Sequence, residues 1–209
     1  AVIAPDVNDV EGDFQGTPFN GDFDGNGHVV SNLTARGESY LGLFGQVETG
    51  KVRSLHLEAV DVNGTGGHVG GLTGQNLGTI TECGVTGSVT GNAPVGGLAG
   101  ANSMVGTITR CYAACTVLDV ESGGGVGSGG GFVGSNIGWA FAFQSPVISN
   151  CYSHVLGGGR VSGLLVGVNA SGGGMGLLDP GTINNCYAAC DGSAEVQATG
   201  LVGSNVGDI

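Results

Sequence analysis

Residues 97–111 read Gly-Leu-Ala-Gly-Ala-Asn-Ser-Met-Val-Gly-Thr-Ile-Thr-Arg-Cys, and close variants of this stretch recur along the chain. The glycine phrase that opens it occurs six times, and the last glycine of each copy is Gly45, Gly74, Gly100, Gly134, Gly167 or Gly203. Successive copies are therefore 29, 26, 34, 33 and 36 residues apart. Such a period is typical of stacked supersecondary units that bury their apolar faces only against their neighbours.

A second motif follows the glycine phrase in the first five copies: an apolar residue, two variable residues and a small apolar residue. Its two apolar positions are Val52/Leu55, Ile80/Cys83, Ile108/Cys111, Ile148/Cys151 and Ile183/Cys186. In a flat strand this spacing would put the two side chains on opposite faces. Both can point inward only if the chain bends between them, and we assume such a bend.

The composition favours strands over helices. Glycine supplies 46 of the 209 residues and mean hydropathy is +0.24, while good helix formers are scarce. Short apolar segments separated by turn residues predict three short strands per turn. We expect the glycines at the corners of a backbone that turns every few residues.

Stacking such turns about 4.8 Å apart would align equivalent residues in columns. We predict an interior column of isoleucines at Ile80, Ile108, Ile148 and Ile183. A second column contains Cys83, Cys111, Cys151 and Cys186, with Leu55 in the first copy. A third contains Asn76, Asn102, Asn136, Asn169 and Asn205, placed where a corner is expected. We interpret all three as structural, with the asparagine amides bonded from turn to turn.

The cysteines leave two interpretations open. Leu55 in place of the first cysteine favours small buried hydrophobes, whereas neighbouring turns would bring Cα atoms within the range of disulfide bonds. Cys115 and Cys190 lie two turns apart, which is too far for a direct bond. His154 follows Cys151 by three residues and completes no zinc set.

The phrase Gly-Leu/Phe-x-Gly-x-Asn followed by Gly-x-Ile-x-x-Cys resembles the GLUG repeat of large bacterial surface proteins, which include adhesins and regions that accompany IgA-type peptidases. Residues 21–33 resemble the opening turn of such repeats and of pectate-lyase-like β-helices. The resemblance spans about residues 19–209, with departures at Val47 and Leu164. It implies a right-handed parallel β-helix outside the cell and no single activity.

We therefore predict an all-β, right-handed parallel β-helix of about seven turns, roughly 30 Å long at the usual strand spacing. One repeat domain covers residues 1–209, with an acidic lead-in at 1–18, an opening turn at 19–33 and GLUG-like repeats at 34–209. We expect the repeats to continue in a longer protein.

Seventeen acidic residues against five basic ones give a formal charge of −12. This charge disfavours nucleic acid and anionic membranes as partners, and no apolar stretch is long enough to cross a bilayer. The acidic residues Asp6, Asp9, Glu11 and Asp13 offer oxygen ligands for Ca²⁺, although a solvated acidic face is the alternative. We expect no other cofactor.

The connection from the repeated asparagine to the repeated isoleucine grows along the chain, over 4, 6, 12 and 14 residues. Insertions on one side of a solenoid often form its binding face. We predict a partner-binding corner formed by Trp139, Phe141, Phe143, Met175, Leu177 and Leu178. Packing of these side chains on each other is the alternative.

We expect no catalytic residues, because the chain has five cationic residues, no Asp-Asp pair and no acid that recurs at one position of adjacent turns. The predicted function is a non-catalytic extracellular segment that extends, displays or adheres at the cell surface. Its partner would be a surface or matrix protein or glycan. The alternatives are a polysaccharide-binding or lyase-like β-helix and a filament subunit that stacks end to end on its own copies.

Overall fold

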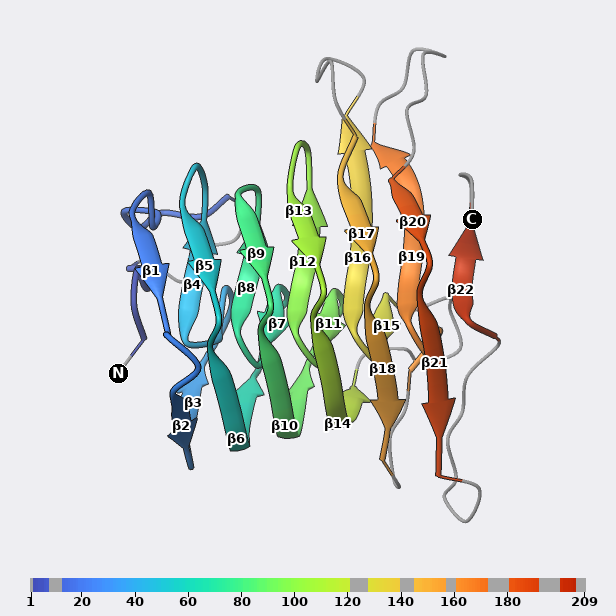
Figure 1. The fold of residues 1–209 in the computed structure, drawn as a ribbon, viewed down its shortest axis with the longest axis horizontal. Helices are drawn as coiled ribbons and strands as arrows, with labels where there is room; N and C mark the ends of the chain where they lie inside the picture. Colours follow the sequence, from blue (N-terminus) through green and yellow to red (C-terminus); the bar gives the residue numbers. More distant parts are fainter. Residues whose placement is uncertain are drawn as a thin grey trace.

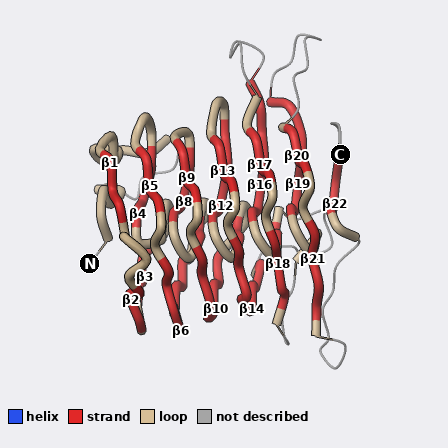
Figure 2. Tube along the Cα trace, in the orientation of Figure 1, coloured by secondary structure: helices blue, strands red, loops and turns tan. Residues whose placement is uncertain are grey.

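The computed structural model describes residues 2–7, 13–120, 128–139, 145–156, 161–172, 181–191 and 200–205. Within these ranges the chain forms twenty-two strands and no helix, so the all-β prediction is confirmed (Figures 1 and 2). Every pairing between these strands is parallel. It follows that none of the residues just given belongs to a long apolar helix that could span a lipid bilayer.

Two long sheets take one strand from each successive repeat, and their strands follow one another along the long axis (Figure 1). The isoleucine sheet contains β1 (Asp22–Asp24), β5 (Lys51–Arg53), β9 (Thr79–Thr81), β13 (Thr107–Thr109), β17 (Val147–Ser149) and β20 (Thr182–Asn184). The tyrosine sheet contains β2 (Val29–Ser31), β3 (Thr34–Gly37), β6 (His56–Gly64), β10 (Gly84–Gly91), β14 (Tyr112–Asp119), β18 (Tyr152–Val155) and β21 (Tyr187–Cys190).

A third long sheet and one short sheet complete the described fold. The asparagine sheet contains β4 (Phe44–Val47), β8 (Thr73–Asn76), β12 (Ala99–Ser103), β16 (Val133–Trp139), β19 (Val166–Gly172) and β22 (Val202–Asn205). The short sheet contains β7 (Val69–Gly70), β11 (Val95–Gly96) and β15 (Gly129–Gly130). The three long sheets correspond to the three expected strands per turn. The short sheet was not expected, because strands of two residues leave no apolar segment to detect.

The core consists of columns of equivalent side chains. Ile80, Ile108, Ile148 and Ile183 are paired in register from β9 to β20. Their side chains are almost completely buried, with at most 4% of the residue exposed. We call these four residues the isoleucine column, and its strand register agrees with the sequence-based prediction.

A left-handed residue bends the chain after each strand of the isoleucine sheet from β5 onward. These residues, which we call the bend column, are Ser54, Glu82, Arg110, Asn150 and Asn185, with φ of 51°, 56°, 54°, 53° and 49°. The bend turns the backbone so that Ile80 and Cys83, three residues apart, are both buried. This is the bend that was assumed above so that both apolar positions of the second motif could point inward.

The repeated glycines do not have left-handed φ, so access to left-handed angles does not explain why they repeat. Among the glycines of the described ranges, only Gly27 and Gly87 have φ in the left-handed region. Close packing explains the repeat instead: a Cβ on Gly74 would lie 2.6 Å from the His68 carbonyl oxygen, and one on Gly100 would lie 2.5 Å from the Val69 nitrogen. Only glycine lets the backbones approach this closely.

Ile3 of the lead-in and Phe19 at the start of the opening turn cover the first edge of the asparagine sheet. Ile3 forms a parallel bridge with Phe44, and Phe19 forms one with Val47. The Phe19 and Phe44 rings pack with their centroids 5.0 Å apart. The residues before β1 therefore include a cap on the stack.

Candidate functional site

The repeated asparagines form one chain of side-chain amides through the interior. Each Nδ2 donates to the Oδ1 of the next asparagine, over 2.8, 2.9, 2.9 and 2.8 Å for Asn76–Asn102, Asn102–Asn136, Asn136–Asn169 and Asn169–Asn205. The first four are completely buried. None of the five has a left-handed φ, so they lie within strands and not at corners. The asparagine column, as we call it, joins successive coils.

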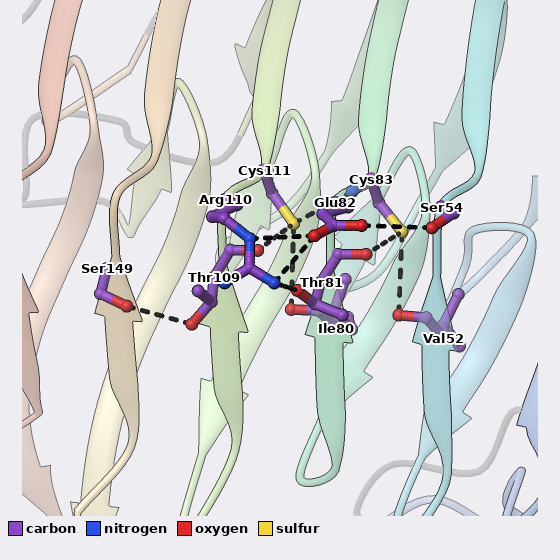
Figure 3. Close-up of polar contacts among 10 residues, drawn as sticks. All are labelled: Val52, Ser54, Ile80, Thr81, Glu82, Cys83, Thr109, Arg110, Cys111 and Ser149. Carbon is purple, nitrogen blue, oxygen red and sulfur yellow. Dashed lines mark hydrogen bonds and ion pairs between the residues drawn. The ribbon is translucent and has the colours of Figure 1, made fainter. Parts of the chain in front are cut away.

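The thiols of Cys83, Cys111, Cys151 and Cys186 form a second column, directly after the bend. Figure 3 shows Cys83 and Cys111. The Cys83 amide donates to the Cys111 sulfur over 3.4 Å, and the Cys151 amide donates to the Cys186 sulfur over the same distance. All six cysteines are free thiols in the structure. Burial raises the pKa of Cys111 well above its usual range. These contacts and the burial fit small core side chains.

The other two cysteines are separated by one rung. Cys115 pairs in register with Val155, which pairs with Cys190. Burial raises the pKa of Cys115 to about 12, so its thiol stays protonated at neutral pH. The placement matches the separation of two turns inferred from the sequence.

The outer side of the bend column is polar and exposed (Figure 3). Arg110 forms an ion pair with Glu82 at 2.8 Å, and the Ser54 hydroxyl donates to Glu82 over 3.3 Å. More than half of the Glu82 and Arg110 side-chain surface is open to solvent. Such surface pairs contribute little to stability.

Arg53 lies between two carboxylates, the arrangement closest to a lyase-like centre in the described ranges. It contacts Asp22 at 3.3 Å and Asp24 at 3.2 Å. Its hydrogen bond with Asp24 raises the pKa of the guanidinium, so Arg53 stays protonated and cannot serve as a base. The Asn26 amide and Arg53 together lower the pKa of Asp24. This cluster pairs charges and is not prepared for proton transfer.

The predicted partner-binding corner lies outside the described residues. Trp139 ends β16, where its backbone pairs in register with Gly172, but its side chain is not described. Phe141, Phe143, Met175, Leu177 and Leu178 lie entirely outside the described residues. The corner therefore stays a prediction.

The calcium prediction is covered only in part. Asp9 and Glu11 lie outside the described residues. The Asp6 carboxylate accepts a 2.9 Å hydrogen bond from the Gln15 amide. In the part of the chain that is described, no three His, Cys, Asp or Glu side chains come together as a metal site.

An elongated groove crosses the outer face of the asparagine sheet. Two hollows, of about 330 and 260 Å³, share Gln75 and Ser103 in their linings, so they lie side by side and together make up this groove. We call it the axial groove and define it by Tyr40, Gln46, His68, Gln75, Ser103 and Ser135. Its lining comes from β4, β8, β12 and β16 and from the segments that precede the short sheet.

Rings form one wall of the axial groove. The Tyr40 and His68 rings stack at 4.6 Å with their planes 5° apart, and Phe14 packs edge-on against Tyr40 at 5.3 Å. Tyr40 and His68 both have left-handed φ, of 52° and 58°. Because the stack covers one face of each ring, the ring edges and the outer faces are what remain for other contacts.

Amides and hydroxyls form the floor. The Gln46 amide donates to Gln75 Oε1 over 2.6 Å, and Gln75 Nε2 donates to the Ser103 hydroxyl over 3.4 Å. Burial lowers the pKa of His68 to about 4, so its imidazole is neutral at pH 7. No clear signal in the sequence reveals this groove, because Gln46, Gln75 and Ser135 hold one repeat position whose residue type varies.

A row of aromatic side chains, also missed, follows the outer face of the tyrosine sheet. Tyr112, Tyr152 and Tyr187 are paired in register, and the rings of the last two lie 4.5 Å apart. Tyr112 lies over Gly84 and approaches His56 at 5.8 Å. The repeated Cys-Tyr dipeptide was the signal that could have revealed this tyrosine row.

Comparisons with known proteins support the fold and give no single activity. No family model matches the chain. It is 39% identical over 99 residues to halomucin of Haloquadratum walsbyi, a match that covers 46% of this chain and 1% of halomucin. Its structure is similar to that of a candidate immunoglobulin A1 protease from Bacteroides ovatus, with a TM-score of 0.61 and 22% identity over 96% of this chain and 74% of that one. At this identity the likeness shows a shared fold alone.

Proposed function

We propose that this chain is a rigid, non-catalytic segment of a longer extracellular surface protein. In this proposal it forms a right-handed parallel β-helix of about seven turns, of the kind found in GLUG-repeat proteins. It separates, displays or attaches other parts of the protein, and the corner that carries Trp139 contacts a partner. The asparagine column is the observation that carries the proposal, because it links the coils by buried hydrogen bonds along the stack.

The physical basis of this function is continuity along the axis. Each coil packs on the next through buried apolar columns, parallel backbone ladders and the amide chain. In such arrays the free energy of folding is approximately the sum of the contributions of each repeat and of each interface between neighbouring repeats. The stack can therefore be lengthened by adding coils, without a new hydrophobic core. A stiff spacer needs this property and needs no reactive group.

The similarity to halomucin supports a segment of a much larger protein, because the match covers 1% of that protein. The candidate protease that shares the fold makes catalysis the alternative to be tested. Against catalysis stands the Arg53 cluster, whose guanidinium is held protonated by Asp24. The capped first edge, where Ile3 and Phe19 pair with β4, disfavours end-to-end stacking of copies at that end.

Two measurements test the proposal together. An antibody raised against the chain should bind intact cells of the organism that produces it, and external protease should remove the signal. The purified chain should release no product from immunoglobulin A1 or from polygalacturonate, with a known protease and a known lyase as positive controls. An intracellular location, or turnover of either substrate, would contradict the proposal.

A further inference from the structure

We propose that the axial groove binds an extended, uncharged oligosaccharide that lies along the axis of the stack. The inference goes beyond a spacer role and does not involve the corner that carries Trp139. It rests on the shape, the hydrogen-bonding groups and the charge of the groove.

The shape of the groove suits a chain-like ligand. Its floor crosses four strands in succession, β4, β8, β12 and β16, which lie roughly 15 Å apart from first to last at the usual strand spacing. The two hollows lie side by side, with Gln75 and Ser103 lining both. A linear molecule of several similar units fits this form better than a compact one.

The polar groups of the floor both donate and accept hydrogen bonds, as sugar hydroxyls do. A glutamine amide has two N–H donors and an oxygen with two lone pairs. In the described contacts Gln75 uses one lone pair for Gln46 and one N–H for Ser103, which leaves one of each for a ligand. Ser135 adds a hydroxyl on the next coil.

The charge of the groove favours an uncharged ligand. Asp13 is the one residue with a formal charge among the described residues that line it, and it lies in the hollow on the side of β4. The neutral imidazole of His68 offers one donor and one acceptor instead of a cation. A polyanion would meet no positive partner there, and the whole chain carries a formal charge of −12.

Apolar contacts complete the lining. Pro94 and Ile137 line one hollow, and Leu77 lines the other. Together with the edges of the Tyr40 and His68 rings, they offer surface for the C–H groups of a sugar. Most small-molecule sites combine such apolar surface with a few placed polar groups.

An extended peptide fits this site less well. Peptides that join a sheet need an unpaired strand edge for their main-chain hydrogen bonds. The floor strand β8 is paired with β4 on one side and β12 on the other, and β12 is paired with β8 and β16. The groove therefore presents side chains, which suits recognition of hydroxyl groups.

The test is calorimetric titration of the whole chain with three neutral hexasaccharides, cellohexaose, laminarihexaose and mannohexaose, and with anionic hexagalacturonate. We expect saturable binding of at least one neutral chain and weaker or undetectable binding of hexagalacturonate. Gln75→Leu removes the amide at nearly the same volume and should weaken this binding at least tenfold. Tyr187→Ala is the matched control on the tyrosine row and should leave the affinity unchanged.

Circular dichroism and a melting curve check that each variant is folded, and Ser103→Ala replaces Gln75→Leu if that variant does not fold. The proposal is overturned if no neutral hexasaccharide binds or if hexagalacturonate binds more tightly. It is also overturned if binding survives the groove substitution, or if Tyr187→Ala abolishes it while the groove variant binds normally.

Discussion

The asparagine column and the bend column run along the same stack, but they constrain the sequence in different ways. In the asparagine column the backbone position and the residue type are the same in five coils, and the first four asparagines are completely buried. In the bend column the backbone angle is the same, while the residue is Ser54, Glu82, Arg110, Asn150 or Asn185.

Burial explains the difference. A buried amide must satisfy its hydrogen bonds inside the protein, and only another asparagine on the next coil does so with the same geometry. A bend residue lies at the surface, where water or a neighbouring bend residue can satisfy its side chain, so no single residue type is required. What remains is the cost of the left-handed angle. That cost is on the order of 1–2 kcal/mol per residue.

The largest expected effect tests the buried columns. Ile108→Asp places an unpaired carboxylate in a completely buried position and should cost several kcal/mol, enough to abolish cooperative unfolding. Thr107→Asp, in the same strand but half-exposed, should cost less than about 1 kcal/mol. Chemical denaturation followed by circular dichroism measures both. If Ile108→Asp is as stable as Thr107→Asp, the isoleucine column does not face the core.

The next effect tests the amide chain itself. Asn102→Ala removes a donor to Asn136 and an acceptor for Asn76, and should lower the free energy of unfolding by about 2–3 kcal/mol. Gln46→Ala breaks a similar amide–amide bond that is only half-buried, and should cost less than about 1 kcal/mol. An equal decrease in the free energy of unfolding for the two variants would mean that burial does not determine how much the amide–amide hydrogen bond contributes to stability.

A pH-dependent effect of similar size comes from His68, a left-handed residue that is partly buried. In the folded protein the pKa of His68 is about 4, below its ordinary value of 6.5. Between these two pH values the unfolded chain therefore binds a proton at His68 and the folded chain does not. The stability that His68 contributes is present above about pH 6.5 and should fall by about 2–3 kcal/mol as the pH drops towards 4.

His68→Asn keeps a residue that tolerates the left-handed angle and removes the titration. Urea unfolding between pH 7 and 4.5 should therefore show a flatter pH dependence for this variant. Identical slopes for the two proteins would contradict the assigned burial of His68.

The smallest expected effect tests the bend column through the sign of a stability difference between two substitutions. At position 82 asparagine should be more stable than valine by about 1 kcal/mol, because asparagine tolerates the left-handed angle and β-branched residues do not. At Thr81, in the preceding strand, the order should reverse, because valine favours extended backbone. Melting temperatures of the four variants, asparagine and valine at each of the two positions, measure this order. The same order at both positions would contradict a left-handed bend at position 82.

The same comparison explains how much of the fold the sequence could reveal. Columns that need one residue type repeat visibly, which is why the isoleucine and asparagine positions were found with the right register. The bend could only be assumed, because Glu82 and Arg110 carry no signal for a left-handed angle. The reason why the glycines repeat was not evident, because close approach of two backbones and a left-handed corner both select glycine.

The candidate site was harder to predict than the fold. In the axial groove Tyr40 and His68 hold equivalent positions in successive coils, and so do Gln46, Gln75 and Ser135, but the residue type at each position changes from coil to coil. The tyrosine row does repeat, but a tyrosine beside a buried cysteine reads equally well as core. Solvent-facing columns are thus the part of a solenoid that its sequence shows least clearly.

The most direct test of the stacked columns is a methyl NOESY spectrum of protein labelled at the isoleucine δ1 methyls. The chain has only seven isoleucines, so the spectrum is simple to assign. With coils about 4.8 Å apart, cross-peaks should join Ile80 to Ile108, Ile108 to Ile148 and Ile148 to Ile183, and none should join Ile80 to Ile183. The stacked columns would be contradicted if the folded protein lacked the cross-peaks between neighbouring coils, or if it showed a direct cross-peak between Ile80 and Ile183.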